Sequence, residues 1–357
     1  MIEHSKTTIQ ENDIDAVVSV LKSRIVNCSH VTEEFEKRFA DYIGVRRAFA
    51  TSSGTNALFL ALKVLGIGRG DEVIIPSYVC DDVLSAVWFA GADAKLADIC
   101  LDDFNIDPDD VELKISKNTK AIICPHLFGM PAQINKLLRL NLPLIEDCAH
   151  SIGAEYENKK VGSFGIISVF SFHALKMLTC GEGGMLLTSN KTICDKLHSF
   201  LFPNFDAQEY TLTFHMSNIS AALGISQLSN IDSFLQKRKE IADTYARELS
   251  DLEVTLPSYK TAERCSSVFR YCIKIGSSLS LEQVFKMYAD EGIIVRSPVK
   301  KALHSFKPFH DQYCSNTEYA IRHVVSLPIY PLLTEEEQKR VINVTKSIFG
   351  KRQDGRA

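Results

Sequence analysis

The chain has 357 residues, of which 45% are hydrophobic, so it is long enough for about two domains and a large apolar core. Its formal net charge is -4 and it contains no long basic run, which argues against nucleic acid or an anionic membrane as a partner and favours small molecules. Charged residues interrupt the N-terminal segment, and no stretch of about 18 consecutive apolar residues occurs. Neither a signal peptide nor a membrane span is therefore expected, and the predicted location is the cytoplasm.

Ten cysteines are dispersed along the chain and form no CxxC pair. This spacing does not resemble that of a zinc site or of a disulfide framework. In a cytoplasmic protein such cysteines are mostly buried or chemically inert thiols, so no metal site is expected.

Between Arg46 and Leu187, short apolar runs alternate with helical stretches. Five strands are predicted, at residues 48–51, 71–76, 94–98, 119–127 and 142–148. Helices are predicted between them, at residues 54–66, 81–92 and 131–140. Strands separated by helices favour right-handed crossovers and a mainly parallel sheet covered on both faces, which is an α/β fold. Ligands of such sheets usually bind beyond the carboxyl ends of the strands.

The pattern changes after residue 190. One long helix is predicted from Ser217 to Leu249, because this segment has apolar residues at helical spacing and no proline. Beyond it, a strand is predicted at 267–275, helices at 281–292 and 334–350, and a loop at 296–314. We therefore expect a large α/β domain at 1–235, with an N-terminal helical segment, and a small α+β domain at 236–357. Residues 351–357 are expected to form a frayed tail.

The segment TSSGTNALFLAL, residues 51–62, places small hydroxyl residues and Gly54 between a predicted strand and a predicted helix. Free backbone N–H groups and the dipole at a helix start can bind a phosphate. An ordinary N-cap, in which a Ser or Thr side chain satisfies its own helix, explains the same pattern. From this segment alone, the N-cap interpretation is favoured.

The segment LIEDCAHSIGA, residues 144–154, places Glu146 and Asp147 at the end of a strand that is too apolar for the surface. A carboxylate there is either solvated at the sheet edge or paired with a cation such as a protonated pyridine nitrogen. For Glu146, a solvated or structural carboxylate is favoured. His150 could contact the same ligand, although an isolated histidine here is more often a core or turn residue.

Lys176 lies between a buried-strand pattern and a glycine-rich turn, in FSFHALKMLTCGEGG, residues 170–184. Lysine is rarely buried without a partner, so Lys176 either lies at a surface turn or is covalently occupied. In a dry pocket it can lose its proton, form a Schiff base with an aldehyde and serve as acid–base catalyst. Ser171 could add a hydrogen bond to a phosphate, whereas His173 is interpreted as a packing residue.

Together these signals are specific. A phosphate cradle at a helix start, an aspartate at a strand end and a lysine about 30 residues further on are the three handles of pyridoxal phosphate: phosphate, ring nitrogen and aldehyde. Longer strings point the same way, among them GDEVIIPSY, PHLFGMPAQI, IEDCAHSIGAEY, GSFGIISVFSFHALKMLTCGEGGMLLT and SLPIYPLLTEEEQKRVI. Over nearly its whole length the chain resembles the DegT/DnrJ/EryC1/StrS family of fold type I pyridoxal-phosphate enzymes, the sugar aminotransferases.

The resemblance implies a mainly parallel seven-stranded sheet between helices, followed by a smaller C-terminal α+β domain. It implies pyridoxal 5'-phosphate as the cofactor, with Lys176 as the Schiff-base lysine, Asp147 as the partner of the pyridine nitrogen and His150 beside the ring. The residues implied to hold the phosphate are Thr55, Asn56 and Ser171, with Gly54 shaping their turn.

The resemblance also implies the reaction. Some members of the family are sugar 3-dehydratases with a histidine in place of the lysine, so the presence of Lys176 favours transamination. The implied reaction moves an amino group from glutamate or glutamine to a nucleotide-diphosphate-linked keto sugar, in the biosynthesis of a cell-surface polysaccharide or a natural product. A homodimer is implied as well, because the family's sites form between subunits.

Several positions depart from the family pattern, among them Cys28 and Ser29, which stand where the family has Gly-Pro before the first helix. Cys80 stands where many members place an aromatic residue against the cofactor ring, so the stacking contact is weaker or comes from Tyr78. The family string GYNYRM reads TLTFHM here, with Thr213 and His215 in place of the asparagine and arginine. This change affects the contact with the partner subunit's phosphate, and such loops bear more on substrate choice than on chemistry.

Two other functions stay open. One is a fold type I enzyme that acts on a non-sugar ketone or an amino acid, because fold and cofactor do not fix the substrate. The other is a cofactor-binding regulatory protein without turnover. The presence of Lys176 and Asp147 argues against the second, since a scaffold has no need of an electron sink.

Overall fold

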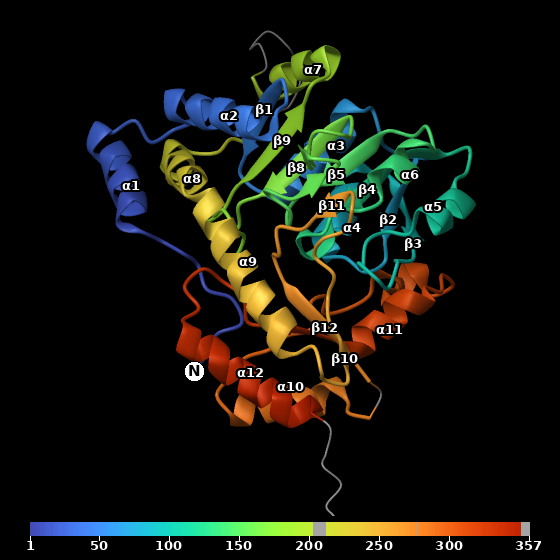
Figure 1. The fold of residues 1–357 in the computed structure, drawn as a ribbon. Helices are drawn as coiled ribbons and strands as arrows, with labels where there is room; N and C mark the ends of the chain where they lie inside the picture. Colours follow the sequence, from blue (N-terminus) through green and yellow to red (C-terminus); the bar gives the residue numbers. More distant parts are fainter. Residues whose placement is uncertain (203–211, 277, 351–357) are drawn as a thin grey trace, which may run out of the picture.

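The computed structural model describes residues 1–202, 212–276 and 278–350, and a seven-stranded sheet lies at its centre (Figure 1). Its strands are β1 (Arg47–Thr51), β2 (Glu72–Pro76), β3 (Asp93–Ala97), β4 (Thr119–Pro125), β5 (Leu144–Asp147), β8 (Ile167–Ser171) and β9 (Gly184–Thr188), in the order β1-β9-β8-β5-β4-β2-β3. β2, β3, β4, β5 and β8 pair in parallel, whereas β9 is antiparallel to both of its neighbours. The predicted mainly parallel α/β sheet is therefore confirmed.

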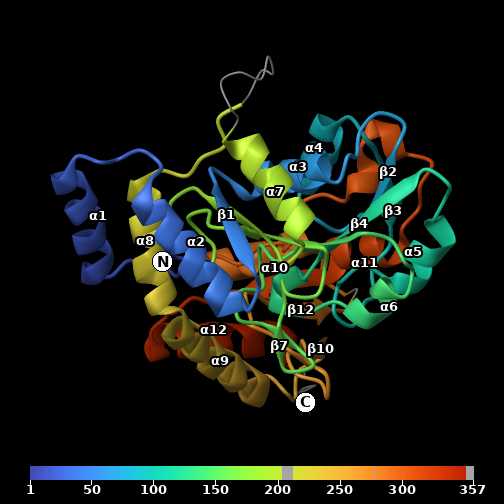
Figure 2. The same cartoon turned by 90° about the horizontal axis from the view of Figure 1, so that it is seen from above.

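Helices bury both faces of this sheet. They are α2 (His30–Ile43), α3 (Gly54–Val64), α4 (Asp81–Ala90), α5 (Pro108–Lys114), α6 (Ile134–Leu138), α7 (Lys191–Leu201) and α8 (Asn218–Ser229), whereas α1 (Glu11–Ser23) packs on α8 and not on the sheet itself (Figure 1). Val73 and Ile75 of β2 pack in one apolar cluster, with α3 and α4, while Ile74 packs in another, with α2. Successive side chains of a strand point to opposite faces, which explains why these strands read as unbroken apolar runs. In Figures 1 and 2, α1 and α5 lie at opposite ends of the molecule.

A second core surrounds a small antiparallel sheet, whose order is β10-β12-β13. Its elements are β10 (Val254–Thr255), β12 (Tyr271–Ile275), β13 (Val324–Leu327), α9 (Ile231–Glu248), α10 (Leu281–Asp290) and α12 (Glu335–Phe349), whereas α11 (Ser315–His323) packs in a cluster of the central sheet. Figure 1 shows α9 running from beside the central sheet to α10 and α12. On this helix Phe234 belongs to a cluster of the central sheet and Ile241 to the second core, so α9 joins the two. The division of the chain near residue 235 stays a prediction.

A third, ribbon-like sheet crosses between the two parts of the chain. It pairs β11 (Arg264–Cys265) with β6 (Glu155–Tyr156), and β6 with β7 (Lys159–Lys160). Beside it, Arg264 forms a salt bridge with Asp103. These contacts hold the segment that precedes β12 against the end of the central sheet.

Two predicted boundaries are wrong. The helix predicted at 217–249 is divided at Asn230, whose side-chain amide donates to the carbonyl oxygen of Ser226 (3.1 Å). An asparagine side chain that bonds its own backbone competes with the helical pattern, and apolar spacing does not detect this. The strand predicted at 267–275 begins only at Tyr271. Val268 there has a φ of 51°, and the backbone N–H of Phe269 donates to the carbonyl oxygen of Phe128 (2.9 Å) instead of to a strand.

The other predicted elements are found close to their expected positions. The loop predicted at 296–314 contains two short turns, η2 (Leu303–Ser305) and η3 (Lys307–Phe309), and a third, η1 (Leu127–Gly129), follows β4. The tail at 351–357 lies outside the described residues. In the part of the chain that the structure describes, no helix is long and apolar enough to cross a membrane.

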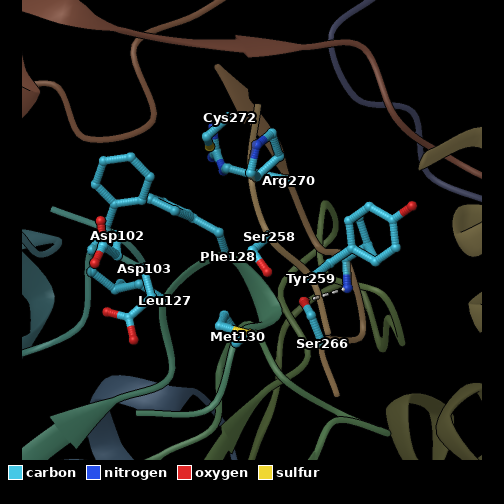
Figure 3. A pocket seen from close by; sticks show the side chains of 13 residues that line it. Asp102, Asp103, Leu127, Phe128, Met130, Ser258, Tyr259, Ser266, Arg270 and Cys272 are labelled. Carbon is cyan, nitrogen blue, oxygen red and sulfur yellow. Dashed lines mark hydrogen bonds between the residues drawn. The ribbon is translucent and has the colours of Figure 1, made fainter. Parts of the chain in front are cut away.

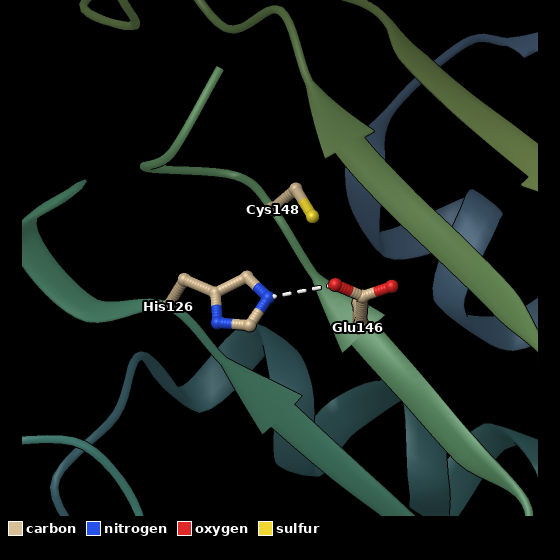
Figure 4. A group of neighbouring side chains, drawn as sticks. All are labelled: His126, Glu146 and Cys148. Carbon is tan, nitrogen blue, oxygen red and sulfur yellow. Dashed lines mark hydrogen bonds and ion pairs between the residues drawn. The ribbon is translucent and has the colours of Figure 1, made fainter. Parts of the chain in front are cut away.

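The carboxylate of Glu146 connects three segments beneath the carboxyl edge of the sheet (Figure 4). It is fully buried in β5 and accepts hydrogen bonds from the Nε2 of His126 (3.1 Å) and from the backbone N–H groups of Gly162 (2.8 Å), Phe164 (2.8 Å) and Gly165 (2.6 Å). Burial alone would raise the pKa of Glu146, but His126 and these N–H groups outweigh it and hold the pKa below the ordinary value. Glu146 is therefore a structural carboxylate, as the sequence favoured, and not a residue that faces a bound cation.

His126, Glu146 and Cys148 lie close enough together to suggest a metal site, with ligand atoms within 4.8 Å of one another (Figure 4). The hydrogen bonds show that the ring nitrogens of His126 already have partners within the protein. The Nδ1 of His126 accepts from the backbone N–H of Ala132 (3.1 Å), so the ring proton is on Nε2, which donates to Glu146. A neutral imidazole bonded in this way has no free lone pair for a metal, and burial keeps Cys148 a thiol by raising its pKa. The group is a hydrogen-bonded network.

We expect Glu146→Gln to lower the free energy of unfolding at pH 7 by about 3 kcal/mol, because the amide would turn a donor towards backbone N–H groups and leave them unpaired. The native pKa of Glu146 is lowered, so its stabilisation is present above the ordinary pKa of 4.5 and lost as the pH falls through the native value. Urea unfolding between pH 7 and pH 3 should therefore show the difference between wild type and variant shrinking.

The exposed Glu282→Gln provides the control, because Glu282 lies on the surface at the start of α10. It should shift stability little at any pH. A Glu146→Gln variant as stable as the wild type at pH 7 would contradict the structural role of this carboxylate.

Candidate active site

A cavity of about 600 Å³ lies at the carboxyl ends of β4, β5 and β8, where ligands of parallel sheets usually bind. The predicted site residues that line it are Gly54, Thr55, Cys80, Asp147, His150, Ser171 and Lys176. They come from segments up to about 120 residues apart, and the sheet topology brings them together. Asn56 does not line this cavity.

The start of α3 forms one wall of the cavity. The side chain of Ser53 accepts a hydrogen bond from the backbone N–H of Asn56 (3.1 Å), so the N-cap interpretation is correct for Ser53. The Asn56 side chain turns instead to the Oγ of Ser52 (2.8 Å). The backbone N–H groups of Gly54 and Thr55 have no acceptor within their own helix, as at every helix start. They remain suited to an anion.

Two glycines allow this wall to form. A Cβ on Gly54 would lie 2.9 Å from the Cβ of Ser171, at the end of β8. A Cβ on Gly184 would lie 2.4 Å from the carbonyl oxygen of Ser53. Both distances are shorter than real contacts of a Cβ atom, so each position requires glycine. The backbone at the start of β9 can therefore pass close to the start of α3. The side chain of Ser171 thereby lies beside the Gly54 backbone, on the wall of the cavity.

Asp147 ends β5 and is buried at the floor of the cavity. Its Oδ1 accepts a hydrogen bond from the backbone N–H of Ala149 (3.0 Å). Burial raises the pKa of Asp147, while the Ala149 N–H and the positive charge of Lys176 oppose the shift. A buried carboxylate with spare acceptor capacity is suited to a cation such as a protonated ring nitrogen.

His150 lines the cavity with its ring stacked on Phe269, at a centroid distance of 4.3 Å and an interplanar angle of 19°. Phe128 lies beyond it, at 6.2 Å and 18°. Burial lowers the pKa of His150 well below its ordinary value, and the positive charges of Lys176 and Arg270 add to this shift. His150 is therefore a neutral, aromatic part of the cavity wall.

Lys176 follows β8 in a turn, with its backbone N–H donating to the carbonyl oxygen of His173 (2.9 Å). Its side chain is half-buried, and the Nζ lies 5.4 Å from the centre of the Phe269 ring. Burial lowers the pKa of Lys176; the negative charge of Asp147 opposes this shift and the positive charge of Arg270 adds to it. Among the described residues Lys176 has no salt-bridge partner, so its amine is available for covalent chemistry.

His173 differs from its interpretation as a packing residue. Its side chain is exposed and lines the cavity, with the Nε2 3.7 Å from the Oε1 of Glu182. The alternation of β8 ends at Ser171, so the strand pattern does not extend to His173. This histidine belongs to the rim of the cavity.

Of Cys80 and Tyr78, only Cys80 lines the cavity. Cys80 lines the cavity at the N-cap of α4, and its Sγ donates to the Oδ2 of Asp82 (3.2 Å). Burial, and after it the neighbouring carboxylates, raise the pKa of Cys80 to about 12. Tyr78 is fully buried against Phe104 and Phe128 and does not line the cavity, so the expectation that Tyr78 replaces the missing aromatic is wrong.

Thr213 and His215 do not line the cavity either, but their segment runs beside its wall. The backbone N–H of Ser52 donates to the carbonyl oxygen of Phe214 (2.7 Å), and His215 forms a bridge with Thr51. Thr213 is exposed next to this contact. The segment is thus attached to the strand that leads into the Gly54 turn.

Further residues of the cavity were not predicted from the sequence. Arg270 and Lys300 reach it from the second part of the chain, and His126, Asp82 and Glu182 from the first. The only available signal for Arg270 is that it is one of two basic residues, with Lys274, in the largely apolar run SVFRYCIKI. The run predicts a strand, and strand periodicity does not show what its arginine faces.

The residues present fit pyridoxal phosphate. Gly54 and Thr55 at the start of α3 line the cavity beside Ser171, Asp147 is buried with no salt bridge among the described residues, and Lys176 has a lowered pKa in the same cavity. These are the three handles that this cofactor requires.

The comparisons with known proteins agree with this geometry. The model of the DegT/DnrJ/EryC1/StrS aminotransferase family matches residues 7–346. Two curated relatives are named GDP-perosamine synthase. The one from Caulobacter vibrioides is 36% identical over 326 residues, 87% of each chain, and the one from Escherichia coli O157:H7 is 32% identical over 328 residues, 88% of each chain.

Solved structures show the same fold. The aminotransferase TlmJ from Streptoalloteichus hindustanus matches with a TM-score of 0.93 at 26% identity, over 97% of this chain and 98% of that chain. The PLP form of the Streptococcus pneumoniae protein Spr1654, described as a candidate sugar aminotransferase, matches with a TM-score of 0.90 at 27% identity, over 97% of both chains. This protein is a pyridoxal-phosphate-dependent aminotransferase, and its chain belongs to the DegT/DnrJ/EryC1/StrS aminotransferase family.

Proposed function

We propose that this enzyme moves an amino group from glutamate or glutamine to a keto sugar linked to a nucleoside diphosphate. The observation that carries the proposal is the convergence of Lys176, Asp147 and the Gly54 turn in one cavity. The two relatives named GDP-perosamine synthase support a GDP-linked sugar as the first substrate to test. The cavity volume of about 600 Å³ is in the range of sites that bind molecules of this size.

We assign separate roles to the residues of the cavity. Bound pyridoxal phosphate supplies an aldehyde and an electron-withdrawing ring. In our proposal Gly54, Thr55 and Ser171 hold the phosphate, and Asp147 faces the ring nitrogen and keeps it protonated. Asn56 contributes its backbone to the turn, whereas its side chain is occupied by Ser52.

Lys176 is proposed to anchor the cofactor and to move the proton during amino transfer. An acid–base catalyst works best when its pKa is near the working pH, and burial moves Lys176 in that direction. His150 is neutral, so it can cover the ring without placing a positive charge beside it. Cys80 lies on the same cavity, where a thiol covers less of a ring than an aromatic side chain does.

We also propose that the enzyme works in the cytoplasm. The supporting observation is that all ten cysteines are free, although several of them are buried where a disulfide would be protected. Such usage is typical of a reducing compartment.

Lys176→Ala should abolish the covalent link to the cofactor and reduce amino transfer by at least about a thousandfold, because anchor and proton carrier are one residue. The measurement is the absorbance of the purified holoenzyme before and after glutamate, followed by borohydride reduction and peptide mapping. In the wild type we expect a glutamate-sensitive band and a label on Lys176.

Lys159→Ala serves as the control, since Lys159 is exposed on β7 away from the cavity. It should retain both the band and the label. A wild-type band that both glutamate and glutamine leave unchanged would favour a binding protein without turnover, and a label on another lysine would refute the site assignment.

A homodimer is the expected assembly. Phe200, Phe202 and Leu212 are apolar and exposed to 43%, 48% and 70%, and Phe202 packs against His215, next to the strand that leads into the Gly54 turn. Apolar side chains exposed beside an active site favour a partner surface there. Size-exclusion chromatography with light scattering should give twice the chain mass of 39.9 kDa.

Leu212→Asp should shift this equilibrium towards the monomer, since a charge would be buried in the interface. Leu113→Asp is the matched control, because Leu113 is 84% exposed on α5, at the far end of the central sheet. A wild type that is monomeric at micromolar concentration would refute the dimer.

A further inference from the structure

Arg270 enters the active-site cavity from the second part of the chain, immediately before β12. Its guanidinium carbon lies 5.4 Å from the centre of the Phe269 ring, and the Nζ of Lys176 lies at the same distance from the same ring. Arg270 also lines a smaller hollow between residues 102–130 and 257–272, where it lies beside Cys272 (Figure 3). The guanidinium is therefore within reach of the reacting amine.

No protein group neutralises this guanidinium. Its Nε and Nη1 are buried and have no hydrogen-bond partner, and Arg270 takes part in no salt bridge among the described residues. The polar groups that act on it most strongly include Cys272, Tyr78 and Cys80, none of which carries a full negative charge at neutral pH. An arginine that loses water without gaining an anion is unfavourable unless a ligand supplies one.

Two neighbouring arginines show what a structural arginine looks like in this region. The Nη1 of Arg238 donates to the carbonyl oxygens of Val268, Phe269 and Ile329, at 3.4, 3.1 and 3.1 Å. Arg264 is paired with Asp103 and also donates to the carbonyl oxygen of Pro131. Arg270 follows Phe269 directly in the chain, yet it is left without either kind of partner.

We propose that Arg270 binds the carboxylate of the amino donor, which makes the donor an amino acid and not a simple amine. This inference rests on the proposed function. A guanidinium presents its N–H groups as a planar fork that matches the two oxygens of a carboxylate. The carboxylate of an amino acid is attached to the carbon that bears the nitrogen, so a donor nitrogen near Lys176 places its carboxylate close by.

The other anions of the reaction fit Arg270 less well. The cofactor phosphate has its own cradle, built from α3 and β8. The diphosphate of a nucleotide-linked sugar is separated from the reacting carbon by the sugar ring, so it lies far from Lys176. Arg270 lies close to Lys176, because both side chains approach the same Phe269 ring. The exposed Lys300, on the rim of the same cavity, is better placed for that group.

The test compares the holoenzyme of the wild type with Arg270→Gln. Calorimetry with glutarate, a dicarboxylate without an amine, should show binding that is weaker by about thirtyfold or more in the variant. The glutamate concentration that half-saturates the loss of the cofactor absorbance band should rise by a similar factor. The affinity for GDP should be unchanged.

Arg270→Lys provides a second variant in case the glutamine does not fold. Lysine keeps the positive charge but lacks the planar set of N–H donors that matches a carboxylate, so glutarate should bind at least about threefold more weakly. Arg296→Gln is the matched control, since Arg296 is an exposed arginine near Arg270 and should leave glutarate binding unchanged.

The outcomes are separable. If neither glutamate nor glutamine changes the wild-type absorbance, the proposed function fails. If the wild type responds to glutamate but Arg270→Gln binds glutarate as tightly as the wild type, only the inference about Arg270 is overturned. Loss of GDP affinity in Arg270→Gln, with glutarate binding intact, would assign Arg270 to the diphosphate and overturn it as well.

Discussion

The buried carboxylate of Glu146 is the interaction on which the active site depends. It joins the end of β5 to His126, at the end of β4, and to the backbone between Gly162 and Gly165, which leads into β8. The next residue along β5 is Asp147, and β8 leads to Ser171 and the Lys176 turn. One charge with four donors therefore fixes the relative positions of the residues that meet the cofactor, and the cost of burying it is offset by hydrogen bonds in every direction.

The sheet, the strand ends and the lysine could be predicted because each leaves a local pattern. Runs such as EVIIP and LIED show burial on both faces, and Lys176 stands out because a lysine needs a reason to be there. What the patterns missed depends on contacts between distant segments. The break at Asn230 comes from one side-chain bond, and the position of Arg270 comes from a segment that bonds to Phe128 instead of extending β12. Periodicity carries no information about either.

Two parts of the chain with separate apolar cores build the cavity together. The phosphate cradle, Asp147 and Lys176 belong to the central sheet, and Arg270 and Lys300 come from the part that follows α9. Phe269 comes from the same later part but packs in a cluster of the central sheet. The Phe269 ring touches both groups, since it stacks on His150 and lies beside Lys176. The first set determines the chemistry that any enzyme of this cofactor class requires, and the second is free to vary with the substrate.

The thiol of Cys80 has a consequence for how the enzyme survives oxidising conditions. A cysteine at the mouth of a ligand cavity is ordinarily the first place where peroxide or an alkylating compound inactivates an enzyme, because the thiolate is the reactive form. Here burial and the carboxylates of Asp81 and Asp82 raise the pKa of Cys80 to about 12, so almost no thiolate exists at neutral pH. The thiol that replaces an aromatic side chain at this position is therefore a weak nucleophile at neutral pH, although the Cys80 side chain is exposed.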